Sequence, residues 1–135
     1  MLKLIADHDI EGHLDVLLRI WTSPSRRETW AWVDCRTFTL RRLGWAENLP
    51  DFEVWRLCQQ SGMVLLTGNR NEESEESLEA TLKKHNTLEC LPVFTIGDPK
   101  KFMLDAIYAG KVADKLLDYL SELDRLMGAG RLYVP

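Results

Sequence analysis

Two short apolar runs in this chain end in polar residues whose types and positions could do chemistry. The run at residues 2–6 is followed by Asp7, and the run at 63–66 is followed by Thr67, Asn69 and Asn71. Each run is typical of a buried strand, and open α/β sheets place their ligand sites at the carboxyl ends of such strands. Carboxylate and amide oxygens are ligands of hard divalent cations such as Mg²⁺ and Mn²⁺. We therefore expect both strands to deliver polar groups to one shared cleft.

Two further carboxylates, Asp51 and Glu53, stand at the start of a predicted helix between these runs. The helix is expected to run to about residue 60, and Gly62 suits the left-handed position at which helices often stop. Asp51 suits the N-cap, and the helix dipole favours an acid such as Glu53 in the first turn. Both acids are candidates for the same cation site, while capping and the dipole explain them without one.

The elements that must position these residues alternate between strand and helix. Strands are expected at residues 2–6, 30–38, 63–66 and 91–96, and helices at 11–21, 51–60, 78–84 and from 99 to about 126. This alternation predicts an α/β fold, a mainly parallel sheet with helices on both faces. Three of the strands lack the alternation of half-exposed strands, which indicates that both of their faces are covered. The tail at 131–135 either adds a strand or packs on the surface.

The last predicted helix is the longest. Asp98 suits its N-cap and Pro99 its first helical position. Met103 and Ile107 belong to its apolar stripe, and Gly110 is expected to loosen it midway.

Composition and charge limit the classes of function. The chain has 17 basic and 21 acidic residues and a net charge of -4, so binding to nucleic acid would need a local basic patch. Arg41, Arg42, Arg56 and Arg70 are the candidates for such a patch beside the cleft, and scattered surface charge explains them equally well. No Gly-rich phosphate loop follows a strand, and the sequence has no recognisable nucleophilic triad.

The chain has no sequence feature of a membrane or secreted protein. No apolar run approaches the ~20 residues of a membrane helix, and the chain opens on a strand rather than on a charged leader. Cys35, Cys58 and Cys90 are odd in number and lie among apolar residues, which favours buried, reduced thiols. We therefore expect a cytoplasmic protein without membrane contact. Its oligomeric state stays open, a homodimer included.

Three segments, taken together, resemble a known family. LIADHDI at the start, DFEVW at the mid-chain helix and VLLTGNRNE at the end of the next strand resemble, in order and spacing, the compact PIN-like proteins of bacteria. That group is similar to the PIN-domain ribonucleases, including the toxins of toxin-antitoxin pairs. The resemblance implies a single domain over residues 1–135 with a three-layer PIN-like fold, and a metal-dependent site for Mg²⁺ or Mn²⁺. It also implies RNA as substrate, and an inhibitory or scaffold protein as partner.

The resemblance also assigns site residues position by position. Asp7 matches the acid at the end of the first strand, and Asp51 or Glu53 matches the acids at the start of the mid-chain helix. After the third strand, the family pattern is Thr, any residue, Asp, any residue, Asp, whereas this chain has Asn69 and Asn71 after Thr67. The implied catalytic residues are Asp7, Asp51, Glu53, Asn69 and Asn71, and the implied metal ligands are Asp7, Glu53, Asn69 and Glu72.

The departure at Asn69 and Asn71 bears on activity. A neutral amide oxygen holds a divalent ion less tightly than a carboxylate, so either Glu72 supplies the missing charge or the site is weakened. In an intact site, the ion lowers the pKa of a bound water and stabilises charge on the attacked phosphate. The alternatives are that Asp7 caps the turn that follows it and that the asparagines are turn residues. Two hypotheses follow: a toxin-like metal-dependent ribonuclease, and a PIN-like interaction module that has lost its chemistry.

Overall fold

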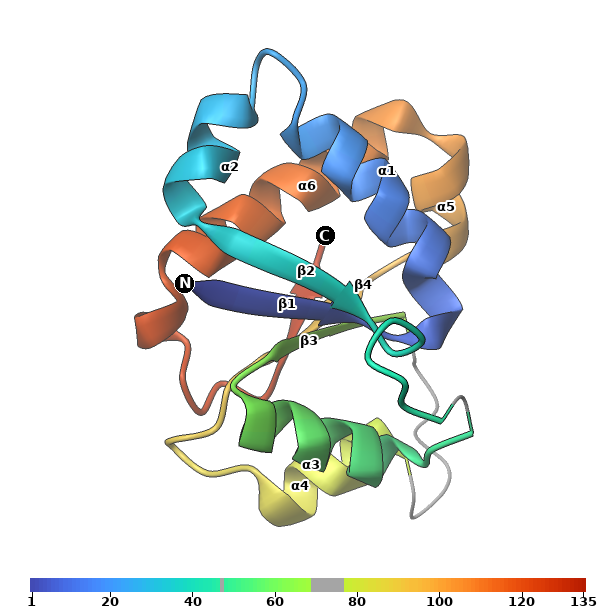
Figure 1. The fold of residues 1–135 in the computed structure, drawn as a ribbon, viewed down its shortest axis with the longest axis vertical. Helices are drawn as coiled ribbons and strands as arrows, with labels where there is room; N and C mark the ends of the chain where they lie inside the picture. Colours follow the sequence, from blue (N-terminus) through green and yellow to red (C-terminus); the bar gives the residue numbers. More distant parts are fainter. Residues whose placement is uncertain (47, 69–76) are drawn as a thin grey trace.

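The computed structural model describes residues 1–46, 48–68 and 77–135. Its centre is a sheet of five parallel strands in the order β2-β1-β3-β4-β5 (Figure 1). The strands are β1 (Leu2–Ala6), β2 (Cys35–Thr39), β3 (Val64–Thr67), β4 (Val93–Ile96) and β5 (Arg131–Val134). Because β2 and β3 lie on opposite sides of β1, the direction of winding reverses between β1 and β3, where ligand sites of such sheets lie.

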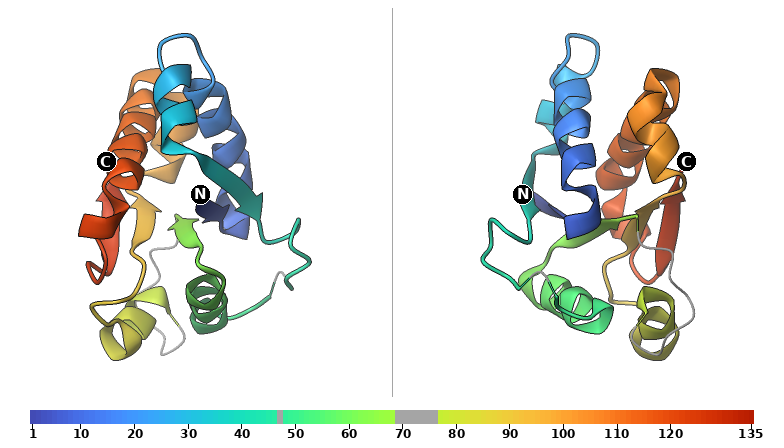
Figure 2. Two further views of the ribbon diagram at one scale, coloured as in Figure 1. Left: turned by 60° about the vertical axis from the view of Figure 1, so that its left-hand side comes forward. Right: turned by 90° about the vertical axis from the view of Figure 1, so that its right-hand side faces the viewer.

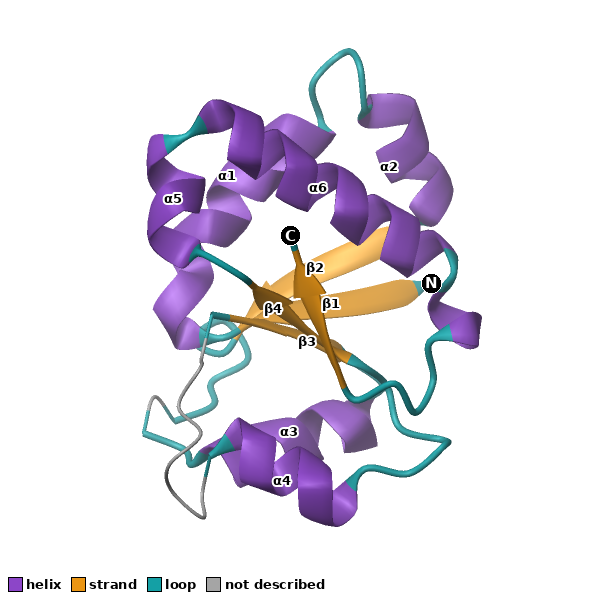
Figure 3. Ribbon diagram, turned by 180° about the vertical axis from the view of Figure 1, so that it is seen from behind, coloured by secondary structure: helices purple, strands orange, loops and turns teal. Residues whose placement is uncertain are grey.

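Helices cover both faces of this sheet. In the described part of the chain they are α1 (Glu11–Trp21), α2 (Arg27–Val33), α3 (Asp51–Ser61), α4 (Leu78–His85), α5 (Pro99–Leu104) and α6 (Ala106–Ser121), with 3-10 turns η1 (His8–Ile10) and η2 (Leu123–Arg125). Helices α1, α2, α5 and α6 lie on one face, and α3 and α4 lie on the other (Figure 2 and Figure 3). This is the three-layer α/β fold that the sequence predicts.

Alternate residues of the central strands pack into different cores. In β1, Leu4 and Ala6 lie in the core beneath α1 and α6, whereas Ile5 lies in the core beneath α3 and α4. Because both faces are covered, the strands show no polar alternation. The prediction that the three apolar runs lie parallel in one sheet between helices is therefore confirmed.

The predicted strand at residues 30–38 is half wrong, because its first part is helix α2. Trp30 stacks on the buried Trp21 with ring centroids 4.5 Å apart. The Trp21 indole Nε1 donates to the carbonyl oxygen of Ala113 at 3.0 Å. Asp34, in a left-handed conformation with φ of 53°, then separates α2 from β2. Packing against α1 and α6 thus outweighs the strand preference of aromatic and β-branched residues.

The predicted last helix is two helices, and the break lies at Asp105 rather than at Gly110. Oδ1 of Asp105 accepts hydrogen bonds from the backbone N–H groups of Ile107 and Tyr108, at 2.9 and 3.1 Å. This N-cap starts α6 as a separate helix. Met103 and Ile107 flank the break and are 51% and 74% exposed, so the prediction that they join the buried stripe is wrong.

Two other boundaries agree with the sequence. Gly62 ends α3 with a φ of 67°, as predicted. The tail forms β5, one of its two predicted alternatives, and pairs with β4. Within the described ranges, no helix is both long and apolar enough to cross a bilayer.

Candidate functional site

The candidate site lies where the carboxyl ends of β1 and β3 meet. Asp7 follows β1 and is 6% exposed. Its backbone N–H donates to the carbonyl oxygen of Leu66 at 2.9 Å. The Thr67 hydroxyl, at the end of β3, donates to Oδ2 of Asp7 at 3.3 Å. Two of the polar groups that the sequence places after the two apolar runs are therefore in contact.

The other carboxylate oxygen of Asp7 is held by His8. Oδ1 accepts a hydrogen bond from the backbone N–H of His8 at 2.8 Å, and the ring Nδ1 of His8 lies 2.9 Å from the same oxygen. The backbone contact makes Asp7 the N-cap of η1, so capping is one role that it fills. Asp7 has no lysine or arginine partner among the described residues.

The negative charge of Asp7 contributes to raised pKa values of two neighbouring groups, Asp9 and Cys58. The pKa of Asp9 is raised, first by desolvation of its carboxyl and then by the nearby charge of Asp7, against the opposing influence of His8 and His13. Burial, followed by the charge of Asp7, raises the pKa of the Cys58 thiol on α3 to about 12. Negative charge is therefore concentrated at the carboxyl end of β1, near α3.

Three segments of the chain meet closely at Gly68, next to Asp7 and Asp9. A Cβ atom at residue 68 would lie 2.9 Å from Cγ of Pro99, 3.1 Å from Cγ2 of Ile10 and 3.5 Å from Oδ2 of Asp9. The end of β3, the turn η1 and the start of α5 thus approach one another so closely that only glycine fits without a shift. The sequence pattern does not predict this close approach at Gly68. A glycine directly after a buried strand is the signal that could have found the close approach.

The two acids of α3 have partners within the protein. Pro50, not Asp51, is the N-cap of α3, and Oδ2 of Asp51 instead accepts a hydrogen bond from the backbone N–H of Leu78 at 2.9 Å. Asp51 therefore fastens the start of α3 to the start of α4, and the prediction that it caps its own helix is wrong. Glu53 forms an ion pair with Arg56 on the same helix, with Oε2 and Nη2 2.6 Å apart.

The remaining predicted site residues are distributed as follows. Arg41 and Arg42 are exposed in the turn after β2, and the backbone N–H of Arg42 donates to the Thr39 hydroxyl at 3.1 Å. Asn69, Arg70, Asn71 and Glu72 lie outside the described residues.

The described residues meet part of the requirement for a divalent ion. Asp7 and Asp9 are hard oxygen ligands of the kind that such an ion prefers, and no described lysine or arginine pairs with Asp7. Glu53, as it stands, is neutralised by Arg56. Over residues 1–46, 48–68 and 77–135, no three or more His, Cys, Asp or Glu side chains gather as a metal-binding group.

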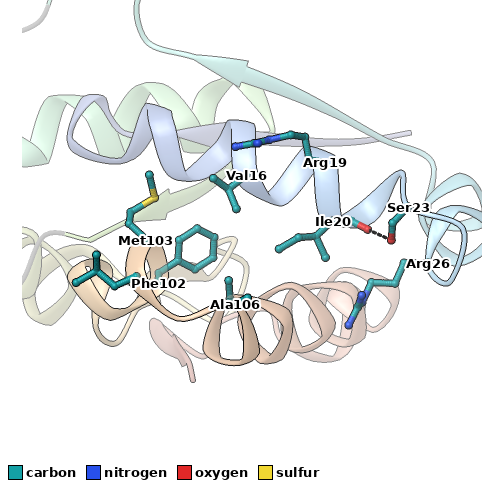
Figure 4. Close-up of a pocket in the computed structure, with 10 residues that line it drawn as sticks. Val16, Arg19, Ile20, Ser23, Arg26, Phe102, Met103 and Ala106 are labelled. Atoms are coloured by element: carbon teal, nitrogen blue, oxygen red, sulfur yellow. Dashed lines mark hydrogen bonds between the residues drawn. The ribbon is translucent and has the colours of Figure 1, made fainter.

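A second candidate surface is a groove between α1 and the α5–α6 pair (Figure 4). Its volume is about 590 Å³. Val16 and Ile20 of α1 face Phe102 and Met103 of α5 across it (Figure 4). A neighbouring hollow of about 360 Å³ shares Met103 with this groove. The two hollows form one apolar surface.

The charged side chains that line this apolar surface are basic. Its charged lining residues, among those described, are Arg19, Arg26 and Lys100. Arg26 pairs with Asp114, with Nε and Oδ1 2.7 Å apart. Leu104, which lines both hollows, is 87% exposed.

Comparisons of the chain with protein-family models, with curated proteins and with solved structures found no match. The fold and the site together define a doubly wound α/β protein with a buried acid at the point where its sheet reverses.

Proposed function

We propose that this protein is a metal-dependent ribonuclease of the PIN-like type, centred on Asp7. One observation carries the proposal: a carboxylate that is 6% exposed lies at the carboxyl end of β1, and no described lysine or arginine pairs with it. Burying a charge is costly unless it is paired or coordinates a metal. The raised pKa of Asp9 next to it supports the same conclusion, since clustered acids with perturbed pKa values are typical of functional sites.

The chain's own residues would divide the work. Asp7 would hold the cation, Asp9 would add negative charge beside it, and Thr67 would orient Asp7 through its hydroxyl. When bound, Mg²⁺ or Mn²⁺ lowers the pKa of a water and stabilises charge on the attacked phosphate. Arg41 and Arg42, exposed after β2, would attract the phosphate backbone of RNA.

Activity should be weak and should prefer Mn²⁺ to Mg²⁺. Asparagines stand where the family pattern has acids, and Mg²⁺ depends more heavily on charged ligands than Mn²⁺ does. Asn69→Asp should therefore raise metal affinity and cleavage together.

The test compares Asp7→Asn with Asp118→Asn, a matched control on the exposed part of α6. Mn²⁺ affinity is measured by isothermal titration calorimetry, and cleavage is measured on single-stranded RNA. Asp7→Asn should abolish cleavage and weaken Mn²⁺ binding by roughly 10-fold or more, as loss of a charged ligand implies. Asp118→Asn should change neither. Brisk cleavage in Mg²⁺ that is indifferent to Asp7→Asn would contradict the proposal.

A second candidate function is an interaction module, and the groove of Figure 4 favours it. Exposed apolar side chains such as Met103 and Leu104 mark interaction sites when they gather around a hollow. Arg26 is neutralised by Asp114, so Arg19 and Lys100 give the rim its positive charge, in a protein with a net charge of -4. The partner that fits is therefore an amphipathic helix with acidic residues beside its apolar face. A second copy fits less well, because Arg19 and Lys100 would face the same cations.

This alternative has its own test. A synthetic helix with leucines on one face and glutamates beside them serves as the probe, and its binding is followed by fluorescence anisotropy. Leu104→Lys and Arg19→Glu should weaken binding, whereas Lys84→Glu, on α4 across the sheet, should not. A dimer that Leu104→Lys dissociates in sedimentation would instead identify a second copy as the occupant and overturn the acidic partner.

A further inference from the structure

A third hollow lies between α4 and the edge strand β5, away from the end of β1. Its volume is about 390 Å³. Glu79, Leu82 and Lys83 of α4 and its C-cap Asn86 line one wall, and Arg131 and Tyr133 of β5 line the other. Arg131 and its β4 partner Val93 begin their strands, so the hollow lies at the amino-terminal edge of the sheet, opposite to the edge that holds Asp7.

The unusual feature of this hollow is the guanidinium group of Arg131. The side chain is 5% exposed, and its Nε and Nη2 atoms are buried without a hydrogen-bond partner. Nη1 makes a long contact of 3.5 Å with the hydroxyl of Tyr133. Oε2 of Glu79 is 3.6 Å from Nε, too far for a hydrogen bond. Burying a cation whose N–H donors have no acceptor costs free energy. The Nε and Nη2 edge of Arg131 is therefore expected to bind an acceptor group.

Two other side chains give the hollow the polarity of a binding site. Asn86 donates through Nδ2 to the carbonyl oxygen of Gly128 at 2.9 Å, while its Oδ1 is buried without a partner. Lys83 is exposed at the rim. With Arg131 and Lys83 against Glu79, the charged side chains that line the hollow carry one net positive charge, in a protein whose net charge is -4.

We propose that this hollow binds a small molecule through an oxyanion, a carboxylate or a phosphate, which replaces Glu79 on Arg131. Nε and Nη2 form the edge of a guanidinium that binds such groups with two parallel hydrogen bonds. The Glu79 side chain is 32% exposed, so its carboxylate can turn to solvent and leave the edge of Arg131 to the ligand. The hollow of about 390 Å³ falls within the size range of small-molecule sites. A donor group on the ligand would satisfy Oδ1 of Asn86.

The test follows the Nε–H resonance of Arg131 by NMR while inorganic phosphate or acetate is titrated into the full chain. The two probes distinguish phosphate from carboxylate as the preferred oxyanion. A saturable shift of this resonance is expected with at least one of them. Glu79→Gln should tighten binding by several-fold, because it removes the competing negative charge. Lys83→Ala should weaken binding by several-fold, while Lys84→Ala, the neighbouring exposed lysine outside the hollow, should leave it unchanged.

Arg131→Lys keeps the charge but loses the paired donors, so it should weaken binding by roughly 10- to 100-fold. Glu79→Gln and Lys83→Ala keep the proposal testable if Arg131→Lys does not fold. The absence of a saturable shift in both the wild type and Glu79→Gln would overturn the proposal. So would a Glu79→Gln variant that is less stable and binds no better, because Glu79 would then be the permanent structural partner of Arg131.

Discussion

The close approach at Gly68 makes a quantitative prediction for stability. In Gly68→Ala, the new Cβ atom would lie 2.9 Å from Cγ of Pro99 and 3.1 Å from Cγ2 of Ile10. Carbon atoms in favourable contact are about 3.5–4.0 Å apart, so each neighbour would have to move by roughly half an ångström or more. Neither neighbour is the far end of a long flexible side chain: Pro99 begins α5, and Ile10 is 1% exposed in the core.

The size of the effect follows from two opposing contributions. Overpacking of this kind costs about 1–3 kcal/mol. Replacing glycine by alanine restricts the unfolded chain and returns about 0.4–1 kcal/mol. We therefore expect Gly68→Ala to lower the free energy of unfolding by about 1–2 kcal/mol.

Gly12→Ala is the matched control, because Gly12 lies in α1 and a Cβ atom there would have no neighbour within 4 Å. It should raise the free energy of unfolding by about 0.5–1 kcal/mol through helix propensity. Urea unfolding of the two variants and the wild type gives these differences from the midpoints, provided that the m-values agree. If Gly68→Ala is as stable as the wild type, the three segments do not meet as tightly as described, and the geometry assigned to the site is wrong.

Two further predictions concern Asp9 and Asp105. Between pH 3.8, the ordinary pKa of Asp9, and its raised folded value, the folded state binds more protons than the unfolded state, so stability falls as pH rises. Asp9→Asn should thus be more stable than the wild type at pH 7. Urea unfolding at several pH values should show this advantage shrinking as the pH falls from the raised pKa towards 3.8, and absent below pH 3.8. Asp105→Ala, which removes the N-cap of α6, should cost about 1 kcal/mol in thermal unfolding, whereas Asp118→Ala should cost almost nothing.

The parts of the fold that the sequence predicts well are those that local pattern determines. The apolar run at Leu2–Ala6 and the amphipathic run at Glu11–Trp21 have the observed boundaries of β1 and α1. Gly62 ends α3 because a residue with positive φ is needed there. In each case the signal lies within a few residues of the structure that it specifies.

Predictions fail where distant contacts decide the structure. The aromatic residues near Trp30 favour a strand by composition, but stacking on Trp21 draws them into α2. Asp51 has the residue type of an N-cap, yet its carboxylate binds the backbone N–H of Leu78, a residue 27 positions away. No local pattern contains this contact, because it depends on how α3 and α4 pack.

The same limit applies to the candidate site, where residue type alone does not reveal charge. Glu53 and Asp7 are equivalent in the sequence pattern, but Arg56 neutralises Glu53 at 2.6 Å. The partners of Asp7 among the described residues are the ring and backbone N–H of His8 and the hydroxyl of Thr67. If Asp7 served only to cap η1, the Oδ1 of an asparagine would accept the same capping hydrogen bond from the His8 backbone N–H without placing a buried charge beside Asp9. The acid is therefore the costlier choice for a cap, and it is the better choice where a cation binds. This difference in cost is the physical reason to assign the site to Asp7 rather than to Glu53.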